Sequence, residues 1–256
     1  MRVWITLFIL WNLSIVGCRT TSTSQDPLRK GDEYFAKGDY DKAQQEYEKA
    51  AQQSASAKQK YRAELMKAAA LDQSNKVDQA LLAYSNLIQK YPKAPAPLLM
   101  RARLLARTQD YISALRDLNR LFRNYTLPPS FKINALALQG QIKYEQGLTK
   151  EAGEILDKAL QLANSKTSIK ATYHYRRLLY NAAKVQFALE NWPRSKELFG
   201  EYIRRKRLNG LPLEEEDNYF YALVLQFNGE YAEAEKYKAN LSQENQIRFE
   251  EEVQKQ

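Results

Sequence analysis

The chain has 256 residues and a formal net charge of +9, and it is long enough for one extended domain or two compact ones. It contains one histidine and one cysteine, which excludes a metal site built from several histidines. Ala, Leu, Gln, Glu, Lys and Arg dominate while Val, Thr and Gly are sparse, and this composition favours helices over strands.

The first predicted element is a signal peptide over residues 1–17. Arg2 supplies a positive start, and an apolar run over residues 3–16 follows it. A bilayer crossing needs roughly 20 apolar residues, so this run is too short to span a membrane. It ends in Ile15-Val16-Gly17-Cys18, which resembles the lipobox of bacterial lipoproteins. The resemblance implies acylation, for example with palmitate, at Cys18. An uncleaved anchor, or an ordinary secretory signal with an incidental cysteine, is the alternative.

Residues 18–25 are predicted to form a flexible linker behind this lipid anchor. Two or three acyl chains hold a protein firmly, since each buried methylene contributes about 0.8 kcal/mol. The second residue of the mature chain is Arg19 rather than Asp. By its resemblance to known sorting signals, this pattern implies the outer membrane with the protein facing the periplasm, and the inner membrane and the cell surface are the alternatives.

Six pairs of small residues, each pair twelve positions apart, follow the linker. A bulky residue comes four positions after the second member of five pairs, and Tyr237 lies one place early in the sixth. Two antiparallel helices approach to about 8–10 Å only where their side chains are small, so each pair marks the crossing point of a helical hairpin. Turn-forming residues lie midway between the two members of each pair. The pairs are Gly31/Ala43, Ala68/Ala80, Ala102/Ala114, Gly140/Ala152, Ala183/Ser195 and Ala222/Ala234.

This pattern resembles the tetratricopeptide repeat, whose period is about 34 residues. The second small residues are separated by 37, 34, 38, 43 and 39 positions, so most repeats carry extra residues. The resemblance implies an all-α superhelical solenoid of about six hairpins over residues 26–240, in which each hairpin is stabilised by its neighbours. A capping helix and tail over residues 241–256 would cover the last repeat. An irregular helical bundle with coincidental spacing is the alternative.

No residues suited to catalysis, metal binding or cofactor binding stand out. His174 lies in a basic helix start and is interpreted as a solvated or packing residue rather than a triad base. No glycine-rich loop suited to phosphate is present. The acidic run at residues 214–217 is interpreted as favourable charge at a helix N-terminus, with an acid/base or calcium site as the alternative. The chain is therefore predicted not to be an enzyme.

Positive charge is concentrated over residues 165–210, which hold eleven Lys or Arg against three Asp or Glu. From residue 211 onward, eleven acids face four bases. A basic patch is predicted at Arg204, Arg205, Lys206 and Arg207, which would attract anionic lipid head groups, an acidic cell-wall polymer or an acidic partner segment. The alternative is that these side chains only pair with residues 214–217 across the loop. Nucleic acid is not expected as a partner of an exported lipoprotein.

The resemblance to the tetratricopeptide repeat also implies a partner-binding groove lined by the first helices of the hairpins. Cationic and aromatic side chains suit an extended or helical peptide, although some of them are expected to pack between repeats instead. The carboxylate clamp of chaperone-binding members is not completed. The predicted groove residues are Leu99, Arg103, Arg107, Asn134, Gln141, Tyr144, Arg177, Tyr180, Lys184, Phe187, Tyr219 and Phe227.

Taken together, these features predict a non-catalytic scaffold that binds another envelope protein or a peptide segment. In size, anchor and repeat content the chain resembles helical lipoproteins that assist outer-membrane barrel assembly or pilus secretin assembly, which implies a role in assembling an envelope complex. The alternative is a structural lipoprotein that binds anionic cell-wall polymer or lipid through its basic surface.

Overall fold

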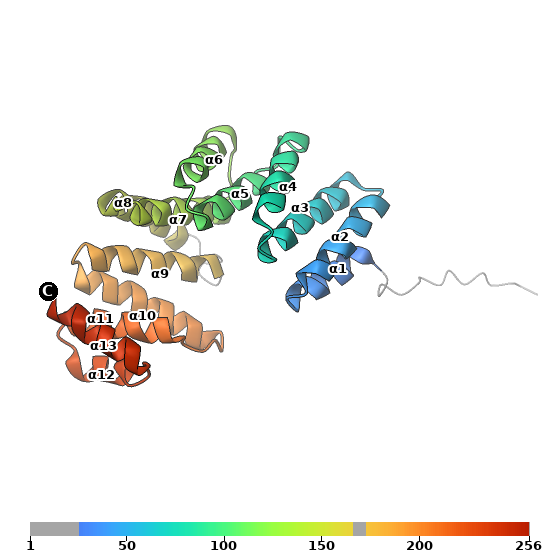
Figure 1. Cartoon of the computed structure of the whole chain (residues 1–256). Helices are drawn as coiled ribbons and strands as arrows, with labels where there is room; N and C mark the ends of the chain where they lie inside the picture. Colours follow the sequence, from blue (N-terminus) through green and yellow to red (C-terminus); the bar gives the residue numbers. More distant parts are fainter. Residues whose placement is uncertain (1–25, 166–172, 256) are drawn as a thin grey trace, which may run out of the picture. The chain divides into compact units, whose positions relative to one another are not determined.

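The computed structural model describes residues 26–165 and 173–255, which form helices joined by short loops and contain no strand (Figure 1). The predicted signal peptide, Cys18 and the linker lie outside the described residues. The helices are α1 (Pro27–Ala36), α2 (Tyr40–Gln53), α3 (Ala57–Gln73), α4 (Val77–Lys90), α5 (Ala96–Arg107), α6 (Tyr111–Asn124), α7 (Pro129–Glu145), α8 (Thr149–Asn164), α9 (Tyr173–Ala188), α10 (Trp192–Leu208), α11 (Glu215–Phe227), α12 (Tyr231–Lys238) and α13 (Gln243–Gln254).

A residue with left-handed backbone lies in each of the six predicted turns. A positive φ suits glycine best, because a Cβ is strained there, yet three of the six are larger residues. In the first turn, the Asp39 N–H donates to the Tyr34 carbonyl at 3.0 Å, which closes the end of α1, and equivalent bonds close α5, α7, α9 and α11. The residues are Gly38, Asn75, Gln109, Gly147, Glu190 and Gly229, with φ between 59° and 78°.

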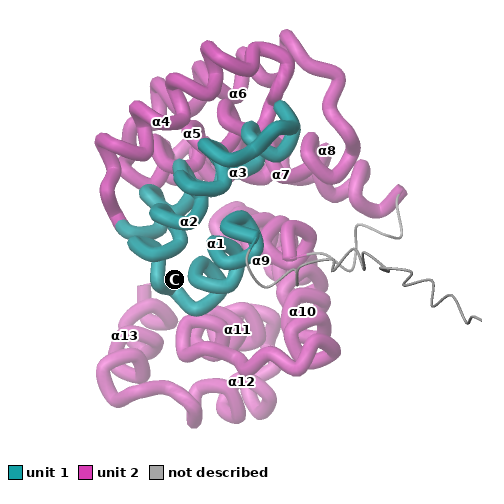
Figure 2. The backbone as a smooth tube through the Cα atoms, turned by 90° about the vertical axis from the view of Figure 1, so that its right-hand side faces the viewer, with its two compact units in different colours: residues 1–74 teal, residues 75–256 magenta. Residues whose placement is uncertain are grey.

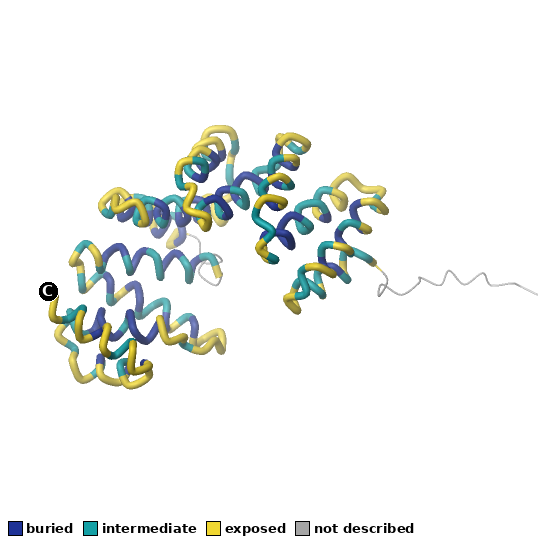
Figure 3. The backbone as a smooth tube through the Cα atoms, in the orientation of Figure 1, coloured by how far each residue is buried: buried dark blue, intermediate teal, exposed yellow. Residues whose placement is uncertain are grey.

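The small residues at the predicted crossings are all buried. Buried residues recur at intervals along the helices and are drawn as dark blue segments in Figure 3. A Cβ added to Gly31 would lie 2.6 Å from the ring of Tyr47, and one added to Gly140 would lie 2.6 Å from Leu156. The bulky residue of the second helix therefore packs directly on the small residue of the first. This contact confirms the predicted register of those two hairpins.

The chain divides into two compact units, residues 1–74 and 75–256 (Figure 2). The described part of the first unit consists of α1, α2 and α3, packed around Ala43, Tyr47 and Ala70. The hydroxyl of Tyr47 donates to Asp32 at 2.8 Å, and Arg62 reaches the other oxygen of Asp32 at 2.7 Å. The boundary falls within the turn of the second predicted hairpin, so α3 and α4 belong to different units.

The second unit holds four complete hairpins: α5 with α6, α7 with α8, α9 with α10, and α11 with α12. One hydrophobic cluster runs from α7 to α13, and another joins the helices from α4 to α7. Arg101 on α5 donates two hydrogen bonds, each 2.7 Å long, to Asp117 on α6. The last helix, α13, packs on α11 and buries Phe249 in the larger cluster. A helix thus covers the final hairpin, in the region where the capping helix was expected.

Candidate functional site

A pocket of about 430 Å³ opens between the first helices of neighbouring hairpins in the second unit. Gln141 of α7 stands on one side, and residues from α9 and α10 form the wall. The loop at residues 209–214 and the first turn of α11 form the opposite side. The pocket lies within the last three hairpins, where the basic segment at residues 165–210 is followed by the acidic run at residues 214–217.

A buried ion pair forms the floor of the pocket. The Lys206 ammonium donates to one carboxylate oxygen of Asp217 at 2.6 Å, and both side chains are less than a tenth exposed. The Tyr202 hydroxyl donates to the other oxygen at 2.8 Å, and the main-chain N–H of Glu214 also bonds Asp217, at 3.0 Å. Burial, followed by the bond to Asp217, raises the pKa of Tyr202, so this hydroxyl keeps its proton. The floor thus fixes the start of α11 against α10.

Two arginines on α9 form a basic rim. Arg177 donates to the amide oxygen of Gln141 at 2.8 Å, while the guanidinium of Arg176 lies 5.7 Å from the centre of the Tyr173 ring. Neither arginine makes an ion pair with a carboxylate in the described part of the chain. Burial lowers the pKa of His174 on the same helix, and the charges of Arg103 and Arg177 lower it further. This end of the site is therefore electropositive.

The opposite rim is acidic, but its charges are close to cations of the chain itself. Glu214 lies 3.5 Å from Lys206, and Glu216 lies 4.0 Å from Arg248 on α13. Both carboxylates are exposed, so each contact is individually weak.

Aromatic side chains fill the space between α9, α10 and α11 behind the pocket. The ring of Tyr180 lies 5.4 Å from that of Tyr202, and burial together with the neighbouring carboxylates raises the pKa of Tyr180 to about 12. Further along, Trp192 stacks on Phe227 at 4.9 Å, and Phe187 meets both rings edge-on. Phe187 and Phe227 pack against the core, and Tyr180 and Tyr202 are the aromatic residues of this group that line the pocket.

The predicted groove residues occupy several different environments. Gln141, Arg177 and Tyr180 come together in the pocket. Leu99 and Tyr219 are each 4% exposed. Arg103 donates to Asn134 at 3.2 Å, and Lys184 lies over the Tyr180 ring. Tyr144, Phe187 and Phe227 pack against the core. Arg107 is exposed at the end of α5. Partner binding by this set stays a prediction.

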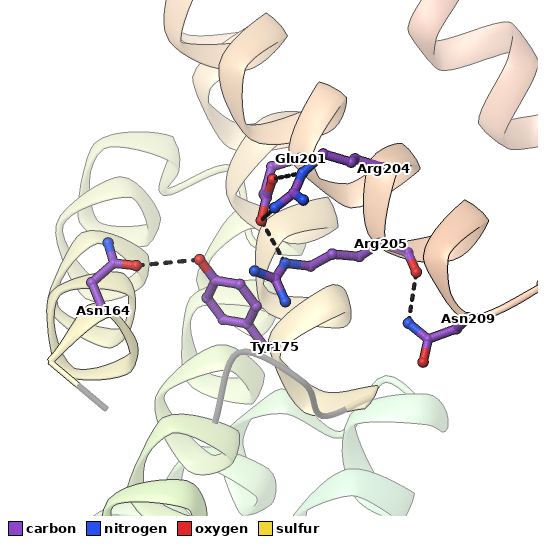
Figure 4. A network of polar contacts seen from close by, with 6 residues as sticks. All are labelled: Asn164, Tyr175, Glu201, Arg204, Arg205 and Asn209. Atoms are coloured by element: carbon purple, nitrogen blue, oxygen red, sulfur yellow. Dashed lines mark hydrogen bonds and ion pairs between the residues drawn. The ribbon is translucent and has the colours of Figure 1, made fainter. Parts of the chain in front are cut away.

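The four residues of the basic run at 204–207 contact several different partners, and Figure 4 shows the contacts of Arg204 and Arg205. Arg204 and Arg205 both bond Glu201, and Arg205 also lies over the Tyr175 ring at 4.8 Å. Arg207 donates to the Tyr237 hydroxyl at 3.1 Å, while Lys206 lies in the pocket floor. The pairing across the loop that the sequence offered as the alternative thus forms for Lys206. Anion binding by the three arginines stays a prediction.

Sequence reasoning did not identify Tyr202, Asn181 or the loop residues Leu211 and Pro212 as part of a site. Tyr202 belongs to a second helix, whose residues are not expected to line the groove of a repeat protein. The extra residues between the fifth and sixth hairpins could have indicated the pocket, because a long loop beside a groove can form one of its walls.

In the described part of the chain, no group of three or more His, Cys, Asp or Glu is placed to hold a metal ion. Within the same residues, none of the helices combines the length and the apolar character that crossing a membrane requires.

Comparison with known proteins identifies the family to which this architecture belongs. A family model described as tetratricopeptide repeat matches residues 28–95 and 99–167, more than half of the chain. None of the curated proteins matches the chain.

Solved structures share the fold at low sequence identity. PilF of Pseudomonas aeruginosa has a TM-score of 0.70 at 13% identity, over 90% of this chain and 96% of that one. PilW, described as a widely conserved type IV pilus biogenesis factor, has a TM-score of 0.67 at 17% identity, over 86% and 96%. A tetratricopeptide-repeat protein from Parabacteroides merdae has a TM-score of 0.56 at 19% identity, over 83% and 76%. The predicted all-α repeat fold is thereby confirmed.

Proposed function

Because this chain belongs to the tetratricopeptide-repeat family, whose stacked hairpins bind other proteins or peptides, we propose that it is a non-catalytic scaffold of the bacterial cell envelope. In this proposal, acyl chains on Cys18 hold the protein at the outer membrane, facing the periplasm. Its partner is another envelope protein, which it helps to assemble into a larger complex. The similarity to PilF and PilW supports the fold, and PilW's description as a pilus biogenesis factor makes a pilus-type assembly one candidate.

The observation that carries this proposal is the pocket on the first helices. Its rim offers the guanidinium of Arg177 and the amide of Gln141, and its wall offers the ring of Tyr180. A pocket that combines an aromatic wall with a few directed polar groups is suited to hold a side chain of a partner. A scaffold needs such a feature to hold its partner.

Affinity capture with two tryptophan variants tests this site. Gln141→Trp places a large ring in the pocket, and Lys158→Trp places the same ring on the exposed side of α8 as a matched control. We expect full-length wild-type protein and Lys158→Trp to recover the same envelope protein from solubilised membranes, while Gln141→Trp loses it without a change in melting temperature. Equal recovery by both variants would exclude the pocket as the binding site.

A basic stripe on α6 supports a second candidate function, the binding of an anionic cell-wall polymer or lipid. Arg116, Arg120 and Arg123 point to one side of the helix beside Ile112, which is 72% exposed. None of the three arginines hydrogen-bonds or ion-pairs with a described residue. In this alternative, capture recovers only peptidoglycan or lipid, and it depends on the α6 arginines rather than on Gln141.

A further inference from the structure

We infer that the pocket binds an acidic segment of the partner, with a side-chain carboxylate held by Arg176 and Arg177. This inference rests on the proposed function and names the chemistry of the segment that the scaffold recognises. It follows from the balance of charge around the pocket, from the remaining hydrogen-bonding capacity of the arginines, and from the apolar surface beside them.

The charge balance around the pocket favours an incoming anion. Lys206 on the floor pairs with Asp217 and also lies near Glu214, so these three groups together carry one negative charge, while Glu216 lies near Arg248. The two arginines of the basic rim have no such partner among the described carboxylates. With Arg248 included, four cations face three carboxylates around the pocket, so the net charge is positive, and the two arginines without a carboxylate partner lie on α9.

The arginines retain donors with which to bind a carboxylate. A guanidinium carries five N–H donors, and Arg177 directs one nitrogen, Nη2, at Gln141. Arg176 lies 5.7 Å from the centre of the Tyr173 ring, and none of its N–H groups donates a hydrogen bond to a described residue. Two neighbouring guanidinium groups on one helix can bind a carboxylate through paired N–H donors, which is the geometry that arginine offers and lysine does not.

Apolar surface around the arginines strengthens such a contact and sets its direction. Tyr173 is 62% exposed, and Leu211 and Pro212 stand across the pocket from it. A ligand that covers these groups removes water from the ion pair, and this strengthens the electrostatic attraction. The acidic rim at Glu214 and Glu216 repels a second carboxylate, so the acidic residue lies toward α9 and the neighbouring uncharged residue toward the loop.

Asn181 offers a further contact for an extended segment. Its Nδ2 atom is buried at the pocket wall and has no acceptor in the described part of the chain. Buried amide donors are nearly always hydrogen-bonded in proteins. A main-chain carbonyl of the bound segment supplies the acceptor once the amide turns toward the pocket.

Matched peptides test the inference on the full-length protein. The probes are fluorescent dodecamers, amidated at the C-terminus, in which a single central Glu, Gln or Lys is flanked by Tyr, Leu and Pro. We expect the Glu peptides to bind at least tenfold more tightly than the Gln peptides, and the Lys peptides not to bind. The double variant Arg176→Gln/Arg177→Gln should lose the preference for Glu, while Arg116→Gln/Arg120→Gln on α6, which removes the same charge, should keep it.

Three outcomes would overturn the inference: equal binding of Glu and Gln peptides, a preference for Glu that survives loss of both α9 arginines, or no binding of any peptide. The capture experiment with Gln141→Trp separates this failure from failure of the proposed function. If a partner is still captured through the pocket, the scaffold stands and only the acidic chemistry is wrong. If no partner depends on Gln141, the scaffold site itself is wrong.

Discussion

Glycine and serine at the helix crossings show how single residues set the distance between paired helices. Gly31 leaves room for the ring of Tyr47, which is fully buried in the first hairpin. The fifth hairpin has Ser195 at the same place, and its buried hydroxyl donates to the Ala183 carbonyl at 2.9 Å. A polar atom is tolerated in the crossing because it is hydrogen-bonded to the facing helix. Volume is thus restricted at these positions more strictly than polarity.

Gly31→Ala tests that restriction. Alanine favours a helix over glycine by about 1 kcal/mol, so propensity alone predicts a more stable protein. The added methyl group would lie 2.6 Å from the Tyr47 ring, and overpacking of this kind costs about 1–3 kcal/mol. We expect a lower free energy of unfolding in chemical denaturation. The control is Gly200→Ala in α10, where the new Cβ meets only the hydroxyl of Tyr221, at 3.3 Å, and where we expect little change or a gain.

The buried pair of Lys206 and Asp217 makes a different prediction. Lys206→Met leaves the Asp217 carboxylate buried without its cation, and loss of one partner of a buried pair costs about 3–5 kcal/mol. The Tyr202 hydroxyl still bonds this carboxylate, so we expect the lower end of that range. Adding Asp217→Asn should recover part of the loss in a double-mutant cycle. Additive effects of the two substitutions would contradict the pairing.

At the scale of the helices, the sequence predicted the hairpins well because their rule is local. A small residue, a turn residue such as Gly38 and a bulky residue recur at fixed spacing, and each is read without knowledge of the rest of the fold. The sequence offered the pairing across the loop that forms the pocket floor only as an alternative, and it did not predict the pocket as a whole. Its floor joins Lys206 to Asp217 across a loop, and its rim depends on which neighbour Arg177 reaches. Such choices depend on how hairpins stack, which spacing within one hairpin does not determine.

One exposed carboxylate on α11 binds the start of α13. Glu215 accepts hydrogen bonds from the Ser242 main-chain N–H at 2.6 Å and the Asn245 amide at 2.9 Å. These bonds, that of Asn245 foremost, lower the pKa of Glu215 to about 2. Because the folded pKa lies below the usual value of 4.5, the stabilisation is fully present above that value and is lost as the pH falls toward 2.

Glu215→Ala should therefore loosen the start of α13. We expect faster amide hydrogen exchange over Gln243–Gln254 at neutral pH, with exchange in α9 unchanged. The matched control is Glu216→Ala, which removes an equal charge from the same helical turn but loses only a 4.0 Å contact with Arg248. If amide hydrogen exchange in α13 is the same in both variants, the bonds to Ser242 and Asn245 do not hold the helix.

At the scale of the whole molecule, the anchor and the repeats have separate roles in the proposed function. The repeats offer a pocket for a partner, and acylation of Cys18 would confine that pocket to the membrane surface. The sequence is the basis for the anchor, since Cys18 follows an apolar run that is too short to span a bilayer.

Cys18→Ala should release the protein from the membrane fraction. In the proposed function Cys18 carries the acyl chains, so its removal eliminates them, and no described helix replaces them as a membrane span. Fractionation of cells followed by an alkaline wash measures the release. Membrane attachment that is unchanged in Cys18→Ala would contradict the lipid anchor but would leave the partner pocket untouched.

The central claim is that a protein partner binds at the pocket on the first helices, and site-specific photocrosslinking in intact membranes tests it most directly. A photoreactive phenylalanine analogue replaces Tyr173, which is exposed at the pocket, or Lys158, which is exposed on α8. We predict a discrete crosslinked protein band from position 173 and none of that mass from position 158. Equal crosslinking from both positions, or crosslinks from position 173 to lipid or peptidoglycan only, would contradict the claim.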